Sequence, residues 1–153
     1  MAEIIRVLTT GKIGKYLEGV VDVEDDGTVH GLDARGERWA DIADNAMALE
    51  GLSFDDALIR YELWDGTPTT PQWDESLSGR LHLATGKVAA LSCYGGECDL
   101  QEEFDLGRPD HEWHVRIHRR LLAFEEFTPR IIGTALFKFQ FWSAAPDSRE
   151  AGA

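Results

Sequence analysis

Residues 134–142 read Thr-Ala-Leu-Phe-Lys-Phe-Gln-Phe-Trp, and this stretch indicates a β-strand. Its three phenylalanines occupy alternate positions, with Lys138 and Gln140 between them. A two-residue period is typical of a β-strand that has one apolar and one polar face. Each phenylalanine can bury about 150–250 Å², so we expect this strand to lie against the hydrophobic core of a small sheet.

The same period recurs upstream, where residues 112–118 and 77–83 alternate polar with apolar side chains. Other strand-like segments, such as 4–9 and 57–64, are followed by glycine-containing turn signals. Many short strands separated by turns at intervals of about 8–12 residues are typical of an all-β fold, and short connections favour antiparallel pairing. We therefore predict an antiparallel two-sheet sandwich, or an open barrel, with one short helix.

The helix is expected between Trp39 and Leu49, where apolar residues recur at helical spacing and alanine is frequent. Gly51 stands where such a helix would end. Residues 28–32 are expected to return as a hairpin arm after the turn at 25–27. The longer connection after Arg119 is expected to hold a helical turn within 121–127.

The chain is long enough for one domain and too short for two ordinary ones, with 153 residues and a mass of 17.1 kDa. No repeat or linker divides it, so we expect residues 1–143 to form a single domain. Residues 144–153 are small and polar, and we expect them to be a disordered tail.

The composition excludes several classes of protein. The 28 Asp and Glu residues outnumber the 15 Lys and Arg residues, which gives a net charge of −13. A nucleic-acid-binding protein needs a basic face, and anionic membranes repel a chain of this charge, so neither partner is expected. The sequence contains no apolar run of about 20 residues that would span a membrane. Five tryptophans and seven phenylalanines argue against a disordered chain.

The beginning of the sequence and the cysteines bear on location. Glu3 and Arg6 interrupt the apolar residues near Met1, which is unlike a secretory signal, and we expect a cytoplasmic protein. Cys93 and Cys98 are too few for a disulfide-built scaffold. We expect reduced, partly buried thiols. A hairpin disulfide is the next possibility, and half of a zinc site is a third, for which a second cysteine pair is missing.

Three histidines, His111, His114 and His118, suggest a metal site by their proximity in the sequence. On a strand, however, His114 and His118 share a face at a distance of about 13 Å, and one ion with bonds of about 2 Å cannot bridge that gap. We therefore expect solvent-facing histidines, no metal site and no cofactor. The sequence also lacks a nucleophile motif, a phosphate loop and a dinucleotide fingerprint. These absences do not exclude an enzyme, because a site assembled from distant strands leaves no local pattern.

The acidity is concentrated in the first 100 residues, which hold 19 acids and eight bases. Such a field steers basic partners towards the protein, although net charge also serves solubility alone. Our first hypothesis is a non-enzymatic binding protein, an inhibitor or immunity protein that neutralises a basic partner such as a nuclease. The candidate contacts are carboxylates near turns and loops, namely Asp22, Glu24, Asp25, Asp26, Asp65, Asp74 and Glu75.

The alternative hypothesis is a ligand-binding sandwich or a small enzyme. Its pocket would be mostly apolar, and a histidine with a pKa near neutrality would serve as general base. The candidate lining residues are Trp64, Trp73, Trp113, Trp142, His82, His114 and His118. The simpler explanation for Trp64 and Trp73 is that they close the end of the sandwich. A third possibility is a homo-oligomer that pairs through exposed sheet edges.

Four stretches carry a resemblance to known proteins: residues 62–66 (Glu-Leu-Trp-Asp-Gly), 73–75 (Trp-Asp-Glu), 79–88 and 114–118. They resemble a group of small bacterial β-sandwich proteins over residues 57–143. The overall layout is also distantly similar to the competence protein J family, and this resemblance implies inhibition of a DNA-uptake nuclease. It carries over no catalytic residue.

Overall fold

The computed structural model describes residues 1–14, 16–35, 38–50, 56–123 and 132–144. These residues form two β-sheets and one short 3-10 turn, so the all-β two-sheet fold predicted from the sequence is confirmed. The expected disordered tail lies outside the described residues, apart from Ala144.

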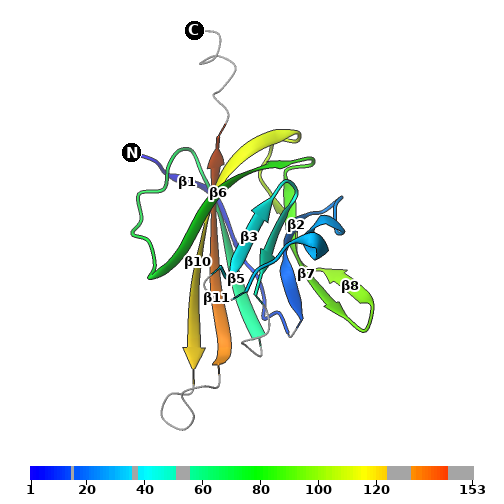
Figure 1. The fold of residues 1–153 in the computed structure, drawn as a ribbon. Coiled ribbons are helices and arrows are strands. Elements are labelled where there is room, and N and C mark those ends of the chain that lie inside the picture. Colours follow the sequence, from blue (N-terminus) through cyan, green and yellow to red (C-terminus); the bar gives the residue numbers. More distant parts are fainter. Residues whose placement is uncertain (15, 36–37, 51–55, 124–131, 145–153) are drawn as a thin grey trace.

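One sheet, which we call the larger sheet because its strands are longer, is built around a long hairpin. Figure 1 shows this hairpin as the yellow and orange strands running side by side. The two strands of this hairpin pair over most of their length, from Trp113↔Ser143 to Ala123↔Ile132. The order across the sheet is β1 (Ile4–Thr9), β5 (Asp56–Trp64), β11 (Ile132–Ser143), β10 (His111–Ala123) and β6 (Glu75–Leu83). The pairing of β5 with β11 is parallel, which corrects the expectation of an entirely antiparallel sandwich.

The smaller sheet packs against the larger one and is antiparallel. The order across it is β3 (Ala40–Ala43), β4 (Ala46–Leu49), β2 (Leu17–Asp22), β7 (Lys87–Tyr94) and β8 (Glu97–Leu100), and the short β9 (Phe104–Asp105) also pairs with β7. The 3-10 turn η1 (Thr28–Gly31) contacts β2 and β4 and is anchored by Val29, which is buried.

The core between the sheets confirms the strand predicted at 134–142. Phe137, Phe139 and Phe141 are all at most 2% exposed, and they point into one cluster with residues of both sheets. Tyr61 of β5 stacks on Phe104 of β9 at a centroid distance of 5.3 Å. This contact joins the larger sheet to β9 of the smaller sheet. Lys138 and Gln140 lie on the opposite, outer face, as the two-residue period predicts.

The helix expected between Trp39 and Leu49 is wrong, because these residues form the hairpin β3–β4. Its turn consists of Asp44 and Asn45, and Asn45 has a φ of 65°. Asparagine tolerates this left-handed conformation better than most residues and is favoured in two-residue hairpin turns. The Asp-Asn pair was therefore a turn signal inside an apparent helical pattern.

Two smaller expectations also need correction. Residues 28–31 form the turn η1 rather than a returning hairpin arm. The helical turn expected within 121–127 is not found where the chain is described, because β10 continues as a strand to Ala123; residues 124–127 lie outside the described part.

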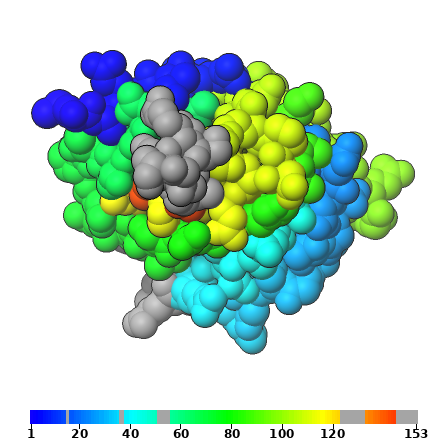
Figure 2. Space-filling view, turned by 90° about the horizontal axis from the view of Figure 1, so that it is seen from above, coloured from blue at the N-terminus to red at the C-terminus, as the bar shows by residue number. Residues whose placement is uncertain are grey.

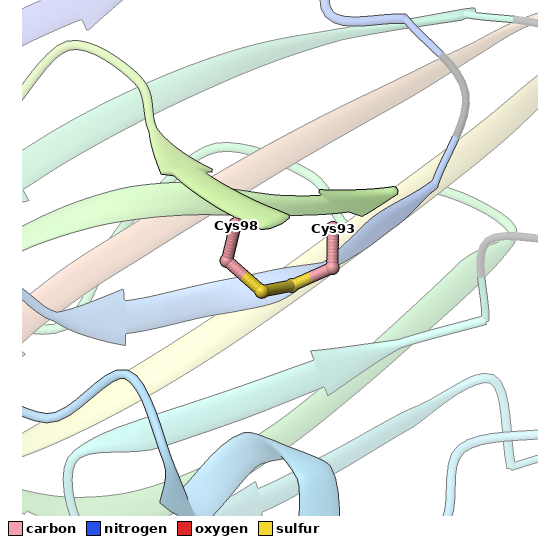
Figure 3. The surroundings of a disulfide bond; sticks show 2 residues. All are labelled: Cys93 and Cys98. Atoms are coloured by element: carbon pink, nitrogen blue, oxygen red, sulfur yellow. A yellow bond between two sulfur atoms is a disulfide. The ribbon is translucent and has the colours of Figure 1, made fainter. Parts of the chain in front are cut away.

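The expectation of reduced thiols is wrong for this structure, in which a disulfide joins Cys93 to Cys98 (Figure 3). The two cysteines are directly opposite in the β7–β8 register, with a Cα–Cα distance of 4.1 Å. Tyr94 also pairs with Glu97, so the turn is only Gly95-Gly96, both at positive φ. This tight turn holds the two thiols within bonding distance of each other.

The exposed edge of the large sheet is β1, in which Ile5 is 59% and Val7 is 45% exposed. An uncovered edge with apolar side chains can pair with another chain, and homo-oligomerisation through this edge stays a prediction. A separate observation concerns membranes. In the described part of the chain, no helix is long and apolar enough to cross one.

Candidate functional site

Four connections meet at one end of the two sheets. They are the loop after β2, the β3–β4 turn, the β6–β7 turn and the loop before β10. Figure 2 views the molecule from above, and the blue, cyan, green and yellow segments that carry these connections lie side by side in it. Hydrogen bonds between the connections fix their relative positions.

Asp22, at the end of β2, organises the first of these contacts. Its carboxylate accepts hydrogen bonds from the backbone N–H of Glu24 at 3.1 Å, and from the backbone N–H and hydroxyl of Thr85 at 2.8 and 3.0 Å. The side chain is fully buried. Asp22 therefore joins the β2 loop to the β6–β7 turn, and we leave it out of the candidate partner contacts because it offers no surface.

The β3–β4 turn is joined to both neighbours. The backbone N–H of Asn45 donates to the carbonyl of His82 at 2.8 Å, and the Asn45 side-chain oxygen accepts from the N–H of Ala84 at 2.8 Å. The carbonyl of Asn45 accepts from the N–H of Asp22 at 2.9 Å. Asp44 accepts from the backbone N–H of His82 at 2.9 Å. The β3–β4 turn thus lies at the centre of this end.

The loop before β10 closes the arrangement. The backbone N–H of Asp110 donates to the carbonyl of Ala84 at 2.9 Å, and its side chain lies 2.6 Å from Nε2 of His82. Gly86 has a φ of +73°, and a Cβ atom at this position would lie 2.3 Å from the carbonyl oxygen of Arg108. Only glycine suits such a backbone conformation and such a close approach.

The surface that results is acidic, and we call it the acidic loop end. It consists of the carboxylates of Glu24, Asp25, Asp26, Asp44 and Asp110, which are exposed or half-exposed. Hydrogen bonds from the hydroxyl and backbone N–H of Thr28 hold the pKa of Asp25 below its ordinary value of 3.8, so this group stays charged. Among the described residues, Lys87 and Arg108 are basic residues whose backbones contact these connections, and five carboxylates outnumber them.

Three of the predicted acidic contacts lie elsewhere, in or next to the loop between β5 and β6. Asp65 accepts a hydrogen bond from the backbone N–H of Glu3 at 2.8 Å, and Asp74 is exposed. Glu75 makes a two-pronged ion pair with the buried Arg119, at 2.8 and 2.9 Å. The structure therefore joins Glu24, Asp25 and Asp26 with Asp44 and Asp110 through loops that bond to one another, whereas Asp65, Asp74 and Glu75 belong to the β5–β6 connection and the start of β6, which have other partners.

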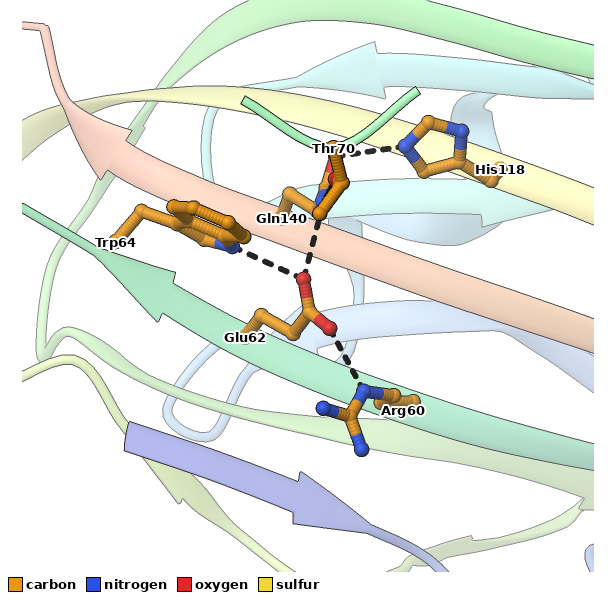
Figure 4. A network of polar contacts seen from close by, with 6 residues as sticks. All are labelled: Arg60, Glu62, Trp64, Thr70, His118 and Gln140. Atoms are coloured by element: carbon orange, nitrogen blue, oxygen red, sulfur yellow. Dashed lines mark hydrogen bonds and ion pairs between the residues drawn. The ribbon is translucent and has the colours of Figure 1, made fainter. Parts of the chain in front are cut away.

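The β5–β6 loop covers part of the outer face of the large sheet, and a buried polar network lies beneath it (Figure 4). Glu62 accepts from Trp64 Nε1 at 2.9 Å and from Gln140 Nε2 at 3.0 Å, and its other oxygen pairs with Arg60 at 2.7 Å. Gln140 also donates to the Thr70 hydroxyl at 2.9 Å, which ties the loop to β11. Glu62 is 4% exposed and Gln140 is fully buried.

His118 extends the network to the other end of the loop. Its Nε2 lies 2.7 Å from the Gln140 side-chain oxygen, and its Nδ1 lies 2.7 Å from the Ser76 hydroxyl and accepts from the Trp73 backbone N–H at 3.3 Å. Burial lowers the pKa of His118 below its ordinary value of 6.5. The histidine expected to face solvent is thus a buried, neutral residue that fixes the loop.

The burial of His118 predicts a pH dependence of stability. Because its pKa is lower in the folded state, the unfolded state binds the extra proton, and stability is lost as the pH falls below about 6.5. Lowered pKa values of His111 and His114 add to this slope, and Glu62, Arg116 and Lys138 are the charged groups around His118. Urea unfolding between pH 7.5 and 5 should show a flatter dependence for His118→Gln than for the wild type. Equal slopes would contradict the assigned role of His118.

The rest of this outer face is basic and aromatic. The guanidinium of Arg116 lies 5.6 Å from the ring centroid of Trp142, and Arg120 and Lys138 lie 4.8 and 5.0 Å from that of Trp73. In the described part of the chain none of these three cations forms an ion pair with a carboxylate. A shallow groove of about 290 Å³ runs between Arg116, Trp142 and neighbouring residues of β6.

The residues proposed for a ligand pocket do not line one cavity. Trp113 faces the core and Trp64 is buried in the polar network, whereas Trp73 and Trp142 lie on the basic outer face. The histidines are divided in the same way. His114 stacks on Trp142 in the shallow groove, His118 is buried under the loop, and His82 belongs to the acidic loop end.

Comparison with known proteins supports the fold. No protein-family model matches the chain, and a search of curated proteins finds no match. Among solved structures, the chain is similar to the crystal structure of ComJ, inhibitor of the DNA degrading activity of NucA, from Bacillus subtilis. The TM-score is 0.59 at 14% sequence identity, over 94% of this chain and 99% of that chain. The expected distant similarity to the competence protein J family is confirmed at the level of fold.

Proposed function

We propose that this protein is an inhibitor that binds a basic enzyme, a DNA-degrading nuclease, and blocks it through the acidic loop end. The observation that carries the proposal is the set of five carboxylates at one end of the sheets, on four connections that hydrogen bonds fix to one another. The similarity to ComJ supports the choice of a nuclease as partner, because the ComJ fold serves inhibition of a DNA-degrading activity.

The chemistry of the surface fits this role. A nuclease binds the phosphates of DNA in a cationic groove, and carboxylates at the end of the two sheets can occupy the positions of those phosphates. The loops are fixed by Asp22, Asn45 and Gly86 before any partner arrives, so little conformational freedom is lost on binding. The net charge of −13 steers a basic partner to the protein and raises the association rate.

A second candidate function is the binding of a small anionic ligand in the groove on the outer sheet face. One observation favours it: Nε of Arg116 is buried and has no hydrogen-bond partner among the described residues. An anion beside Trp142 could supply that partner. Of the residues predicted to line a ligand pocket, Trp142 and His114 belong to this groove, and the others do not.

The test of the inhibitor function is a plasmid degradation assay. The nucleases are NucA and the strongest DNA-degrading activity that cation exchange retains from the cells that make this protein. We expect degradation by at least one of them to stop near one inhibitor per nuclease. We also expect inhibition to weaken at high salt, because salt screens the exposed charges. An unrelated protein of similar net charge is the control. Full activity of both nucleases with excess protein would refute the proposal.

A further inference from the structure

Three potential metal ligands meet on the smaller sheet, two from one hairpin and one from a turn far upstream in the chain. They are His30 of η1, Cys93 of β7 and Cys98 of β8. Their ligand atoms all lie within 4.8 Å of one another. The sequence showed a cysteine pair without further ligands, and the fold supplies the third ligand from a turn far upstream in the chain.

The backbone holds these ligands in place independently of the disulfide. Cys93 donates its N–H to the carbonyl of Tyr16 at 3.0 Å, and its side chain packs against the small cluster around Leu91. The turn that carries His30 is closed by a hydrogen bond from its N–H to Gly27 at 3.2 Å, and its Val29 is buried in the same cluster. Both elements are thus anchored to one piece of core.

The ligand set matches the chemistry of zinc. Zn²⁺ prefers thiolate and imidazole ligands in a tetrahedron, with Zn–S bonds of about 2.3 Å and Zn–N bonds of about 2.0–2.1 Å. Those bond lengths place neighbouring ligand atoms about 3.5–3.8 Å apart, so small side-chain rotations suffice to gather the three atoms around one ion. Three protein ligands leave the fourth position open to water or another donor.

We propose that reduction of the Cys93–Cys98 disulfide converts this cluster into a zinc site formed by Cys93, Cys98 and His30. A dithiol reductant supplies two electrons and two protons, so the S–S bond breaks, two S–H groups form and the reductant becomes a disulfide. Zn²⁺ then displaces both thiol protons and forms two Zn–S bonds, and neutral His30 donates a ring-nitrogen lone pair. Cys98 is exposed, so a reductant can reach the bond.

The proposal goes beyond the inhibitor function, and its site is separate from the acidic loop end. The hairpin carries either a disulfide or a metal ion, and the redox state of the surroundings selects between them. A failure of the zinc experiment would therefore say nothing about the inhibitor function, which the plasmid degradation assay tests separately.

The experiment compares the oxidised and reduced forms of the full chain. Protein is reduced with a phosphine, kept free of oxygen and titrated with Zn²⁺ in competition with a coloured chelator. We expect one Zn²⁺ per chain, bound at least about 100-fold more tightly by the reduced form than by the oxidised form. Co²⁺ in place of Zn²⁺ should give thiolate-to-cobalt charge-transfer absorption in the reduced form only.

Two variants locate the third ligand. His30→Ala, measured in the reduced state, should weaken Zn²⁺ binding at least about tenfold. His114→Ala removes a histidine that lies on the other sheet and should leave binding unchanged. Equal zinc affinity of the oxidised and reduced wild type would overturn the proposal, and unchanged affinity of reduced His30→Ala would overturn the assignment of His30.

Discussion

Replacing Glu24, Asp26 and Asp44 together with their uncharged amides, as Glu24→Gln, Asp26→Asn and Asp44→Asn, is expected to weaken inhibition of the target nuclease by about 100-fold. The substitutions keep size and shape and remove three negative charges from the surface that we propose as the contact with the partner. Glu24 and Asp26 are exposed. The amide introduced at position 44 would keep the oxygen that accepts from His82, so the loops should stay folded. The measurement is the inhibition constant in the plasmid degradation assay.

A charge-matched control separates position from total charge. Glu97→Gln, Asp99→Asn and Glu103→Gln remove three exposed carboxylates on β8 and just after it, so both variants carry the same net charge. The control should lose only the small part of the affinity that comes from long-range steering. If it loses as much inhibition as the first variant, the acidic loop end is not the binding surface.

Replacing Glu62 with alanine is expected to lower the free energy of unfolding by about 2–5 kcal/mol. The variant leaves Trp64 Nε1 and Gln140 Nε2 buried without their acceptor, and each unsatisfied donor costs about 1–3 kcal/mol. Burial raises the pKa of Glu62, but hydrogen bonds from Arg60, Gln140 and Trp64 outweigh it and hold the pKa below its ordinary value. The charged carboxylate is therefore the form that the network stabilises. Urea unfolding at pH 7 measures the loss.

Glu62→Gln is the matched variant, because it keeps one oxygen acceptor for the two donors while removing the charge. It should lose less than half as much stability as Glu62→Ala. If the free energy of unfolding of Glu62→Ala lies within about 0.5 kcal/mol of the wild-type value, the network contributes no more to stability than ordinary surface contacts do.

The core strands could be predicted from the sequence because their signal is local. The phenylalanines at 137, 139 and 141 alternate with polar residues, and a two-residue period leaves only one face for the core. The hairpin at 44–45 could have been predicted as well, since Asp-Asn is a turn signal, but the alanines around it also fit a helix. Alanine is small enough for either environment, so periodicity alone could not decide.

The acidic loop end could be predicted only in part. The sequence indicated Glu24, Asp25 and Asp26 as a charged turn, but Asp44 and Asp110 join them through contacts between loops that are distant along the chain. Asp22 looked like its neighbours and is buried, because Thr85 and Glu24 supply its hydrogen bonds. His30 likewise meets the two cysteines only because η1 folds over the smaller sheet.

Carboxylate footprinting shows which acidic residues the nuclease covers when it binds. A carbodiimide couples an amine to exposed carboxylates in the free protein and in the complex, and mass spectrometry reports the labelling of each residue. We predict that Glu24, Asp26, Asp44 and Asp110 become protected in the complex, whereas Glu97, Asp99 and Glu103 stay labelled. Protection of Glu112 on the basic sheet face, with the acidic loop end still fully labelled, would show that the protein binds its partner through the sheet face and not through the acidic loop end.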